Sequence, residues 1–483
     1  MTPGTATAAR RQAPSAPAST APFTVAELLA ATRGALRRGA PDASLRGIST
    51  DSRHLHAGQA FLALRGPHFD GQAFLTDAVA RGAAALIVRA GQVPPTGTVP
   101  VIAVPDTTVA LGDLARAHRR RLRVPVIAVT GSCGKTTTKE MIAAVLGARY
   151  RVLASVGTEN NQYGVPQTLL RLTPAHEAVV LELGTNHPGE MARLAAIAEP
   201  TIGVLTNFGL AHLEFFGSIH GVLQEKTALV RALAADGVAF VNGDDPMLRR
   251  AMVEQPPAAM LLRFGTGRQC ELQAQRIESL ALGTRCTVDG RCAPAPFPLT
   301  LPLLGDHQVL NALAAVACGL HLGVPSTEIA RVLAALPPVP MRLAPRRANG
   351  LTILDDCYNA NPVSMRQALE VLRRYPGERP TVFVCGDMGE LGPGTRGLHR
   401  EVGRWAREAQ VDVLVAIGRH AASVVDGAAS AGHRLDGVWA CATLEEAQAR
   451  LDRLALTRGT VLVKGSRAMG LERLVDRLME SHA

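Results

Sequence analysis

Short runs of β-branched and aliphatic residues recur along most of the chain, and most are followed by a stretch whose pattern predicts a helix. The runs include VIAVT, VVLEL and IGVLT in the middle of the chain and TILDD, VFVCG, VLVAI and VLVKG toward its end. Short apolar strands that alternate with helices predict βαβ units, and therefore an α/β fold with parallel sheets. Ligands bind beyond the carboxyl ends of such strands, so we expect the chemistry there.

Three domains are predicted behind a disordered tail. A chain of 483 residues is longer than one hydrophobic core usually supports. Residues 1–22 are rich in Ala, Pro, Thr and Ser, which is typical of disorder. Residues 23–122 predict a small α/β domain that ends in the arginine-rich linker RAHRRRLR, 123–338 a central domain with a mostly parallel sheet, and 339–483 a further α/β domain that follows the proline-rich hinge LPPVPMRL. The last two domains are expected to form a cleft.

The composition argues against several classes of protein. The formal net charge is +10, but outside the predicted linker the cations are scattered, and aromatic residues make up 4% of the chain, which disfavours nucleic-acid binding. The eight cysteines contain no CxxC pair, which is typical of reduced thiols in the cytoplasm. No apolar run approaches the roughly 18 residues of a membrane-spanning helix. We therefore expect a soluble cytoplasmic protein with no nucleic-acid partner and no membrane insertion.

Residues 126–146 (VIAVTGSCGKTTTKEMIAAVL) predict a strand, a glycine-rich loop and a helix. In such a loop, backbone amides and the helix N-terminus attract phosphate, Lys135 can reach the β and γ oxygens of a nucleotide, and Thr136 can ligate Mg²⁺. The spacing departs from the common P-loop, because Val129 stands where its first glycine is expected. The alternative is a glycine-rich turn with an incidental lysine, but the order of the residues favours phosphate binding. The loop consists of Gly131, Ser132, Cys133, Gly134, Lys135, Thr136 and Thr137.

Two further polar side chains follow neighbouring predicted strands. Glu182 ends the run VVLE, where a carboxylate needs a partner, either a cation that faces the phosphate loop or a helix amide or arginine. His212 follows the next strand, and a single histidine is more often structural than a ligand. Their places on adjacent βα units together favour a metal site.

Lysine is rare in this chain. Of 51 Lys and Arg residues only 135, 139, 226 and 464 are lysines, which leaves 51 − 4 = 47 arginines. Lys226 lies on a predicted helix, where a lysine usually faces solvent. A retained lysine suggests chemistry that a guanidinium cannot perform, such as nucleophilic attack, titration of an amine or covalent modification. With so few lysines, chance retention remains the alternative.

Four more polar segments lie near or beyond the hinge. Residues 351–362 (LTILDDCYNANP) end a predicted strand in a dense polar turn, and 382–392 (VFVCGDMGELG) and 461–475 (VLVKGSRAMGLERLV) run from strands into glycine loops. Each loop suits either an anion or a capped helix start. Residues 303–319 predict a helix with His307 and Asn311 one turn apart, as core residues or as nucleotide contacts.

Together these segments resemble the Mur ligase family of ATP-dependent ligases. The resemblance covers nearly the whole chain after residue 22 and rests on GSCGKTT, NNQYGVP, ELGTNHPGE, AHLEFFGS, GDHQVLNALAA, DDCYNANP and GDMGELG, in the family's order. The last two favour the branch that adds D-alanyl-D-alanine over the branch that adds the third peptide residue, whose DNPR-type signature the sequence lacks.

The resemblance implies an N-terminal domain that binds the UDP end of UDP-N-acetylmuramoyl-tripeptide, a central ATPase domain and a C-terminal Rossmann-like domain. It implies that ATP and Mg²⁺ are used to join D-alanyl-D-alanine to the tripeptide through an acyl phosphate, in peptidoglycan precursor synthesis. We expect the enzyme to act as a monomer.

The resemblance also implies roles for residues of the central domain. Lys135 and the loop amides would bind the ATP phosphates, and Thr136 and Glu182 would serve one Mg²⁺. His212 would be a further metal ligand. Lys226 matches a lysine that family members carbamylate with CO₂, and the resulting anion would help to hold a second Mg²⁺.

Other roles follow from the same resemblance. Arg342 would face the phosphates at the hinge, and His307, Asn311 and Asp356 would contact the nucleotide. Lys135, Lys226, His212 and Arg342 are the catalytic candidates. The UDP-substrate would be bound by Ser49, Thr50, Asp51, Ser52 and Arg53, with Asn160 and Asn161.

Two departures from the family pattern lie near the predicted site. Met341 replaces the glycine that commonly precedes the hinge arginine, and Ala228 replaces an acid often found two residues after the modified lysine. The rival interpretations are a related acyl-phosphate ligase, such as another Mur enzyme or folylpolyglutamate synthase, and a P-loop ATPase that switches a partner without forming a bond.

Overall fold

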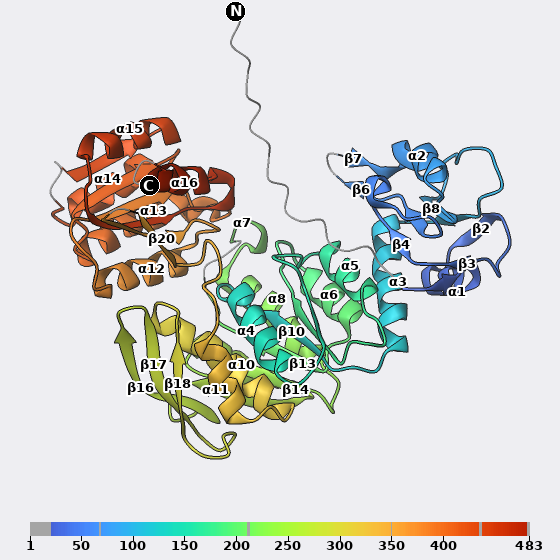
Figure 1. Cartoon of the computed structure of the whole chain (residues 1–483), viewed down its shortest axis with the longest axis horizontal. Coiled ribbons are helices and arrows are strands. Elements are labelled where there is room, and N and C mark those ends of the chain that lie inside the picture. The colour runs from blue at the N-terminus through green and yellow to red at the C-terminus, as the bar shows by residue number, and fades with distance from the viewer. Residues whose placement is uncertain (1–20, 67–68, 210–212, 349, 434–436, 481–483) are drawn as a thin grey trace, which may run out of the picture. The chain divides into compact units, whose positions relative to one another are not determined.

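The computed structural model of the chain describes residues 21–66, 69–209, 213–348, 350–433 and 437–480. The chain divides into two compact units. The first runs up to Arg123 and includes the later segment Ser155–Ala175, and the second comprises Val124–Ala154 and the chain from His176 onward. Figure 1 shows that the second unit contains two separate sheets, each with its own helices. The sequence pattern placed residues 155–175 in the central block, whereas they pack with the first unit.

The first unit is built on a five-stranded sheet in the order β2-β9-β8-β5-β4, in which only the β2 edge strand is antiparallel. A buried apolar cluster that includes Phe61, Leu75 and Leu86 forms a core beside this sheet. The strands are β2 (Ala35–Arg38), β4 (Ile48–Ser49), β5 (Ala60–Leu62), β8 (Ala85–Arg89) and β9 (Val101–Val104), and the helices are α1 (Val25–Thr32), α2 (Leu75–Ala80), α3 (Thr107–Arg121) and α5 (Gly164–Leu170). Two short ladders pair β1 (Phe23–Thr24) with β3 (Ser44–Leu45) and β6 (Arg65–Gly66) with β7 (Phe69–Asp70).

The prediction that RAHRRRLR is a linker is wrong, because most of it forms the last turns of α3. Basic side chains in the last turn of a helix interact favourably with its dipole. The helix is also anchored by packing, since His118 is buried and its Nε2 lies 2.7 Å from the carbonyl oxygen of Leu172. The segment that follows α5 therefore holds the end of α3.

The second unit begins with a nine-stranded sheet in the order β11-β12-β10-β13-β14-β15-β16-β17-β18. It is parallel from β11 to β16, and the β16–β18 edge is antiparallel. The strands are β10 (Val126–Thr130), β11 (Val152–Ala154), β12 (Ala178–Glu182), β13 (Ile202–Leu205), β14 (Val238–Asn242), β15 (Met260–Gly265), β16 (Leu272–Leu280), β17 (Gly283–Asp289) and β18 (Phe297–Leu301). The predicted strands are confirmed, and the antiparallel edge was not foreseen.

Helices cover this sheet and position the polar residues that follow its strands. One large core joins strand residues such as Val129 and Val204 to α4 and to the alanine-rich α10, which packs on α4. The helices are α4 (Lys135–Gly147), α6 (Glu190–Ala198), α7 (Leu213–Phe216), α8 (Ile219–Arg231), α9 (Pro246–Glu254), α10 (Asp306–His321) and α11 (Ser326–Ala334).

The second unit ends with a six-stranded sheet in the order β19-β20-β24-β21-β22-β23, parallel except for β19. The last strand, β24, lies between β20 and β21, and Asp356 pairs with Lys464 in the register of β20 and β24. Such a switch in strand order creates a binding edge at the carboxyl ends of the strands. The strands are β19 (Ala344–Ala348), β20 (Leu351–Asp356), β21 (Thr381–Gly386), β22 (Val413–Ile417), β23 (Val438–Cys441) and β24 (Gly459–Lys464), and the helices are α12 (Pro362–Arg374), α13 (Thr395–Glu408), α14 (Ala421–Ser430), α15 (Leu444–Leu454) and α16 (Glu472–Glu480).

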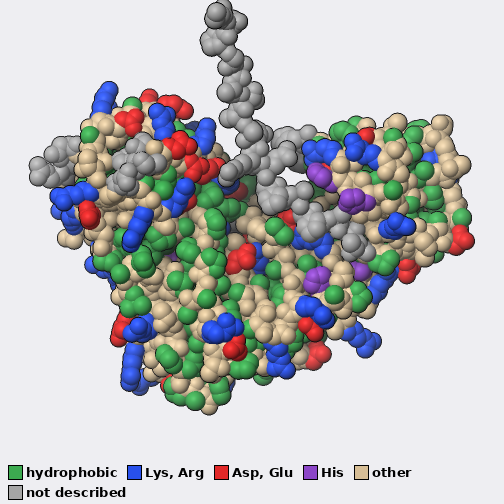
Figure 2. Space-filling view, in the orientation of Figure 1, with side chains coloured by type: hydrophobic (Ala, Val, Ile, Leu, Met, Phe, Trp, Pro, Cys, Tyr) green, Lys and Arg blue, Asp and Glu red, His purple; other side chains and the backbone are tan. Residues whose placement is uncertain are grey.

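The surface carries its positive charge on arginine. Of the four lysines, Lys139, Lys226 and Lys464 are buried and Lys135 is partly buried. Figure 2 shows the basic side chains of one face spread among acidic and apolar ones. None of the described helices has the length and apolar character needed to cross a membrane.

Candidate ligase site

The phosphate loop connects β10 to α4 and is held by residues that follow β13. The amide of Cys133 donates to Asn207 Oδ1 at 2.8 Å, and the carbonyl of Cys133 accepts from Thr206 Oγ1 at 2.6 Å. Within the loop, Lys135 Nζ donates to the Gly131 carbonyl at 2.9 Å. Hydrogen bonds within the protein therefore fix the course of the loop and the position of the Lys135 ammonium.

The two loop glycines are required by close packing. A Cβ on Gly131 would lie 2.0 Å from Thr206 Oγ1, and one on Gly134, whose φ is +79°, would lie 2.4 Å from Asn311 Oδ1. Backbone this close to its neighbours leaves no room for side chains, so the loop can present its amides to a ligand. Asn311 itself accepts from Thr138 Oγ1 at 3.2 Å and donates to Gln308 at 2.9 Å, so its amide braces the start of α4.

Lys135, which is partly buried, has two buried charged side chains near it, the carboxylate of Glu182 and the amine of Lys226. Glu182 ends β12 and pairs with Val129 of β10, and its charge opposes the effect of burial, which lowers the pKa of Lys135. Lys226, on α8, is 1% exposed, and its Nζ donates to Thr185 Oγ1 at 2.9 Å. The pKa of Lys226 is lowered to about 7, first by burial and then by the charge of Lys135, against the opposing acids Glu225, Glu190 and Glu182.

The loop that follows β12 is held by two glutamates that the sequence analysis missed. Glu225, on α8 beside Lys226, accepts from the amides of Gly189 at 2.8 Å and Met191 at 2.6 Å. Glu190 accepts from the amides of Asn186 and His187 at 2.8 and 3.1 Å. Carboxylates at backbone amides fix the course of this loop, which carries Thr185 to Lys226. The segment ELGTNHPGE predicted a turn, but it did not indicate that Glu225, from helix α8, would hold that turn in place.

The hinge brings Arg342 onto the phosphate loop. Its Nη2 lies 3.4 Å from Thr136 Oγ1, and its guanidinium carbon lies 4.1 Å from the centroid of the Tyr358 ring. A guanidinium in this position can interact with phosphate oxygens bound at the start of α4. Tyr358 belongs to the polar segment DDCYNANP, but only its turn character was evident from the sequence.

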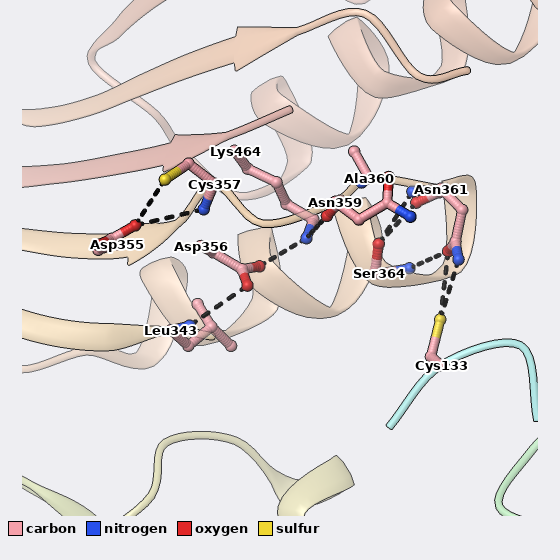
Figure 3. A network of polar contacts seen from close by, with 10 residues as sticks. All are labelled: Cys133, Leu343, Asp355, Asp356, Cys357, Asn359, Ala360, Asn361, Ser364 and Lys464. Atoms are coloured by element: carbon pink, nitrogen blue, oxygen red, sulfur yellow. Dashed lines mark hydrogen bonds and ion pairs between the residues drawn. The ribbon is translucent and has the colours of Figure 1, made fainter. Parts of the chain in front are cut away.

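The polar segment after β20 forms a network with the last strand and with the phosphate loop (Figure 3). Lys464 Nζ donates to Asp356 Oδ2 at 2.6 Å and to the Asn359 carbonyl at 3.0 Å. Asn361 begins α12 as its cap, and its side-chain amide exchanges hydrogen bonds with Cys133 Sγ at 3.2 and 3.3 Å. The structure therefore brings Asp356 together with Lys464, a pairing that the sequence did not indicate.

His307 lies at the amino end of α10, close to the Asp356–Lys464 pair. Its pKa is lowered to about 4, chiefly by burial, while Asp356 and Asp306 raise it and Lys464 lowers it. The imidazole is thus neutral near pH 7, able to donate and to accept one hydrogen bond. A cavity of about 1010 Å³ adjoins it, lined also by Gly305, Leu310, Arg366 and Tyr375. The cavity lies between the start of α10 and residues of α12 and α13, and none of the loop residues 131–137 lines it.

The predicted UDP-side residues lie in the first unit. Asp51 accepts from the amide of Arg53 at 3.0 Å and from its Nη2 at 2.8 Å, and these hydrogen bonds hold the pKa of Asp51 below its usual range. Thr50 Oγ1 accepts from Gln167 of α5 at 2.9 Å, and Asn161 accepts from the amide of Gly164 at the start of α5 at 3.0 Å. The two predicted substrate segments, Ser49–Arg53 and Asn160–Asn161, are thus joined through α5. Ser49 and Ser52 are buried.

Three family profiles match the chain in order. They are the Mur ligase family catalytic domain over residues 44–119, the Mur ligase middle domain over 129–319 and the Mur ligase glutamate ligase domain over 341–467. The UDP-N-acetylmuramoyl-tripeptide–D-alanyl-D-alanine ligase of Bacillus subtilis (strain 168) is 35% identical over 438 residues, 90% of this chain and 94% of that protein. The chain belongs to the Mur ligase family.

Solved structures of Mur ligases share the fold. MurF from Acinetobacter baumannii matches with a TM-score of 0.88 and 35% identity, over 96% of this chain and all of that one (100%). The MurF ligase from Thermotoga maritima in complex with ADP matches with a TM-score of 0.79 and 28% identity, over 90% of this chain and 98% of that one. As a Mur ligase, the protein is an ATP-dependent ligase, and the predicted α/β fold with three domains is confirmed.

The residues of this Mur ligase fit a nucleotide with Mg²⁺. A glycine-lined loop, an ammonium and a guanidinium face one place at the start of α4, and the Thr136 hydroxyl and Glu182 supply the oxygen atoms that Mg²⁺ prefers. No group of three His, Cys, Asp or Glu side chains with metal-site geometry occurs among the described residues. Phosphate oxygens of the nucleotide would complete the coordination sphere, since Mg²⁺ is usually bound by one or two carboxylates plus substrate phosphates. The predicted ligand His212 lies outside the described residues.

Proposed function

We propose that the protein joins D-alanyl-D-alanine to UDP-N-acetylmuramoyl-tripeptide at the expense of ATP, which gives the UDP-linked pentapeptide of peptidoglycan precursor synthesis. The relative from Bacillus subtilis bears the name of this activity and aligns with 90% of the chain. The observation that carries the reaction class is the approach of Arg342, from the hinge, to Thr136 of the phosphate loop. An acyl-phosphate ligase needs cations on both sides of the phosphoryl group that it transfers.

The first step converts a poor acyl donor into a good one. The terminal carboxylate of the tripeptide attacks the γ-phosphorus of ATP, the new C–O–P linkage forms and ADP leaves. Lys135 and Arg342 stabilise the charge that spreads over the transferred phosphoryl group, because both are fixed beside the loop before the reaction. Bound Mg²⁺ supplies further positive charge at the phosphate oxygens.

The second step forms the peptide bond. The free amine of D-alanyl-D-alanine attacks the acyl carbon, a proton leaves the nitrogen, and the tetrahedral intermediate expels inorganic phosphate. Water would destroy the acyl phosphate, so the domains must hold the two reactants together and exclude solvent. The hinge at 336–343 and the Asn361–Cys133 contact are the elements that suit this role.

We further propose that Lys226 is carbamylated. CO₂ reacts with a neutral amine, and a lysine whose pKa is about 7 is substantially neutral at physiological pH. The change from an ammonium to an anion also replaces repulsion from Lys135 with attraction. The carbamate oxygen atoms would give Mg²⁺ a hard ligand, while an arginine at this position cannot form a carbamate.

The two substrate segments of the first unit would bind the UDP end. Asp51 orients the turn that carries Thr50 and Arg53, and Gln167 joins that turn to the helix that follows Asn160 and Asn161. The cavity at His307 is the space we propose for the base of ATP. We expect a cytoplasmic location, because the substrates and ATP are cytoplasmic and the eight cysteines are free thiols. We also expect a monomer, as the resemblance implies.

The decisive experiment measures phosphate release from ATP with Mg²⁺, with UDP-N-acetylmuramoyl-tripeptide, D-alanyl-D-alanine, both or neither, and the mass of the product. We expect release that requires both substrates and a product heavier by one dipeptide. Release that ignores both substrates would favour a switch ATPase. Release with an amino acid in place of the dipeptide, and none with the dipeptide, would favour another ligase of the family.

The carbamate is tested separately with ¹³C-labelled bicarbonate and NMR of the wild-type protein and of Lys226→Gln. We expect a carbamate carbon signal in the wild type and none in the variant, together with wild-type activity that falls when CO₂ is removed and recovers when bicarbonate is added. Lys464→Gln, measured well below its lowered melting temperature, serves as the control for the NMR signal, because it removes another buried lysine and should keep the carbamate signal. Equal signals in wild type and Lys226→Gln would overturn the assignment.

A further inference from the structure

The hinge holds Arg342 in a strained piece of backbone. Met341 and Leu343, on either side of Arg342, have φ angles of +60° and +52°. Residues with a Cβ rarely adopt this left-handed region and persist there only when their surroundings hold them. The position of Arg342 is therefore not an intrinsic preference of the hinge sequence, and something must hold it.

The segment after β20 supplies the restraint. The amide of Tyr358 donates to the Met341 carbonyl at 3.3 Å, and the amide of Leu343 donates to Asp356 Oδ1 at 3.3 Å. Both strained residues are thus tied to this segment. Asp356 is fixed in turn by Lys464, which lies 2.6 Å away on β24. The positive φ of Met341 explains why a glycine is favoured at this position. The two hydrogen bonds explain how a methionine can adopt the same backbone conformation.

The Tyr358 ring extends this restraint to the reactive end of the arginine. The guanidinium carbon lies 4.1 Å from the ring centroid, within the distance of a cation–π contact, while Nη2 reaches toward Thr136. An arginine side chain has many rotamers, and a ring under its plane selects those that point at the phosphate loop. Arg342 and Tyr358 are both partly buried, so water competes less for the guanidinium.

We propose that Tyr358 is a positioning residue, whose ring holds Arg342 in the orientation that it needs for phosphoryl transfer. This inference rests on the proposed function of Arg342. Tyr358 does not touch the reacting atoms in this scheme, so we expect the loss of its ring to affect kcat through Arg342. Because the aromatic ring makes the contact, a phenylalanine at position 358 should hold Arg342 as well as the tyrosine does.

The test is a double-mutant cycle with Tyr358→Leu, Arg342→Ala and the double variant, assayed by pentapeptide formation at saturating ATP. We expect Arg342→Ala to lower kcat by about a hundredfold or more. Tyr358→Leu should lower kcat about threefold to tenfold, in the range of a cation–π contact, with the KM for ATP changed less than kcat. In the Arg342→Ala background Tyr358→Leu should have no further effect on kcat, and Tyr358→Phe should stay near wild type.

Each other outcome identifies what has failed. Wild-type kcat in Arg342→Ala refutes the proposed function of Arg342, whatever Tyr358 does. A loss in Arg342→Ala with additive loss in the double variant refutes the inference alone, and so does a Phe variant as slow as the Leu variant. If Tyr358→Leu does not fold, Tyr358→Met provides an unbranched side chain without a ring. Tyr150→Leu is the matched control, because Arg149 lies over Tyr150 at 5.6 Å, at the far end of α4, and its kcat should not change.

Discussion

Removal of the Lys464 ammonium should unfold the C-terminal part of the chain at a much lower temperature. Lys464 is 2% exposed and Asp356 is 7% exposed, and their charged atoms lie 2.6 Å apart. Lys464→Met removes one charge and leaves the carboxylate buried. Breaking a buried pair in this way costs about 3–5 kcal/mol, because the remaining carboxylate is shielded from water and has lost its counter-ion.

This cost translates into a measurable shift of the melting temperature. For the roughly 145 residues after the hinge, the entropy of unfolding is about 0.3 kcal/mol per kelvin, so a loss of about 3–5 kcal/mol lowers the melting temperature by roughly 10–17 °C. Trp405 and Trp439 are the only tryptophans of the chain and both lie in this part. Tryptophan fluorescence during heating therefore reports on this part alone.

The double variant Asp356→Asn with Lys464→Met separates the pair from general damage. Asparagine keeps an oxygen that can accept from the Leu343 amide, and no charge is then left buried without a partner. We expect the double variant to melt at a higher temperature than Lys464→Met. A double variant that melts no higher than Lys464→Met, or a shift under about 3 °C in Lys464→Met, would refute the reasoning.

Three further results are expected. Gly134→Ala should abolish ATP turnover, because its Cβ would lie 2.4 Å from Asn311 Oδ1 at a φ of +79°, whereas Gly147→Ala in the same helix meets nothing within 4 Å and should be neutral in the same phosphate-release assay. His307 has a pKa lowered to about 4 from 6.5, so its contribution to stability is present above pH 6.5 and is lost as the pH falls toward 4, by at most about 3 kcal/mol. Melting temperatures should therefore fall more steeply over this window in the wild type than in His307→Asn, and parallel curves would contradict the assignment. Asp51→Asn should raise the KM for the UDP-tripeptide but not for ATP in steady-state assays, because Asp51 holds only the turn of the first unit, and equal changes in both constants would count against this.

The sequence predicted those parts of the structure that depend on interactions between residues close together in the chain. The central and C-terminal strands, the phosphate loop and the helix of Lys226 follow from runs of apolar residues, glycines and helix formers, and all are found. The arginine-rich end of α3 was mistaken for a linker, because charge alone does not show that His118 packs against the segment after α5. The antiparallel edge β16–β18 was missed, since its strands are partly exposed and lack the continuous apolar pattern of the parallel ones.

The contacts between distant segments could not be predicted in the same way. The hinge departure at Met341 appeared to weaken the geometry of the site, but the structure shows a left-handed residue held from Tyr358, seventeen positions later in the sequence (358 − 341 = 17). Asp356 was predicted as a nucleotide contact, and it also forms an ion pair with Lys464, 108 residues away. Such pairings depend on strand order, because β24 lies beside β20 only after the sheet has formed.

Three of the four lysines are buried, and burial alone can explain why a lysine is retained. Lys139 is fully buried with Glu140 at 2.5 Å, and Lys464 is buried with Asp356 at 2.6 Å. An ammonium is a compact charge with three donors, whereas a guanidinium brings five donors in a rigid plane, which such confined sites would leave partly without partners. Burial thus explains why lysine is retained at these two positions without any reaction.

Lys226 differs because its neighbours include a hydroxyl at 2.9 Å and the cation Lys135, and its amine loses its proton near neutral pH. Lysine is therefore retained mainly at buried positions. The charges around Lys226 distinguish it, as the lysine that we propose is modified, from Lys139 and Lys464, which stabilise the fold.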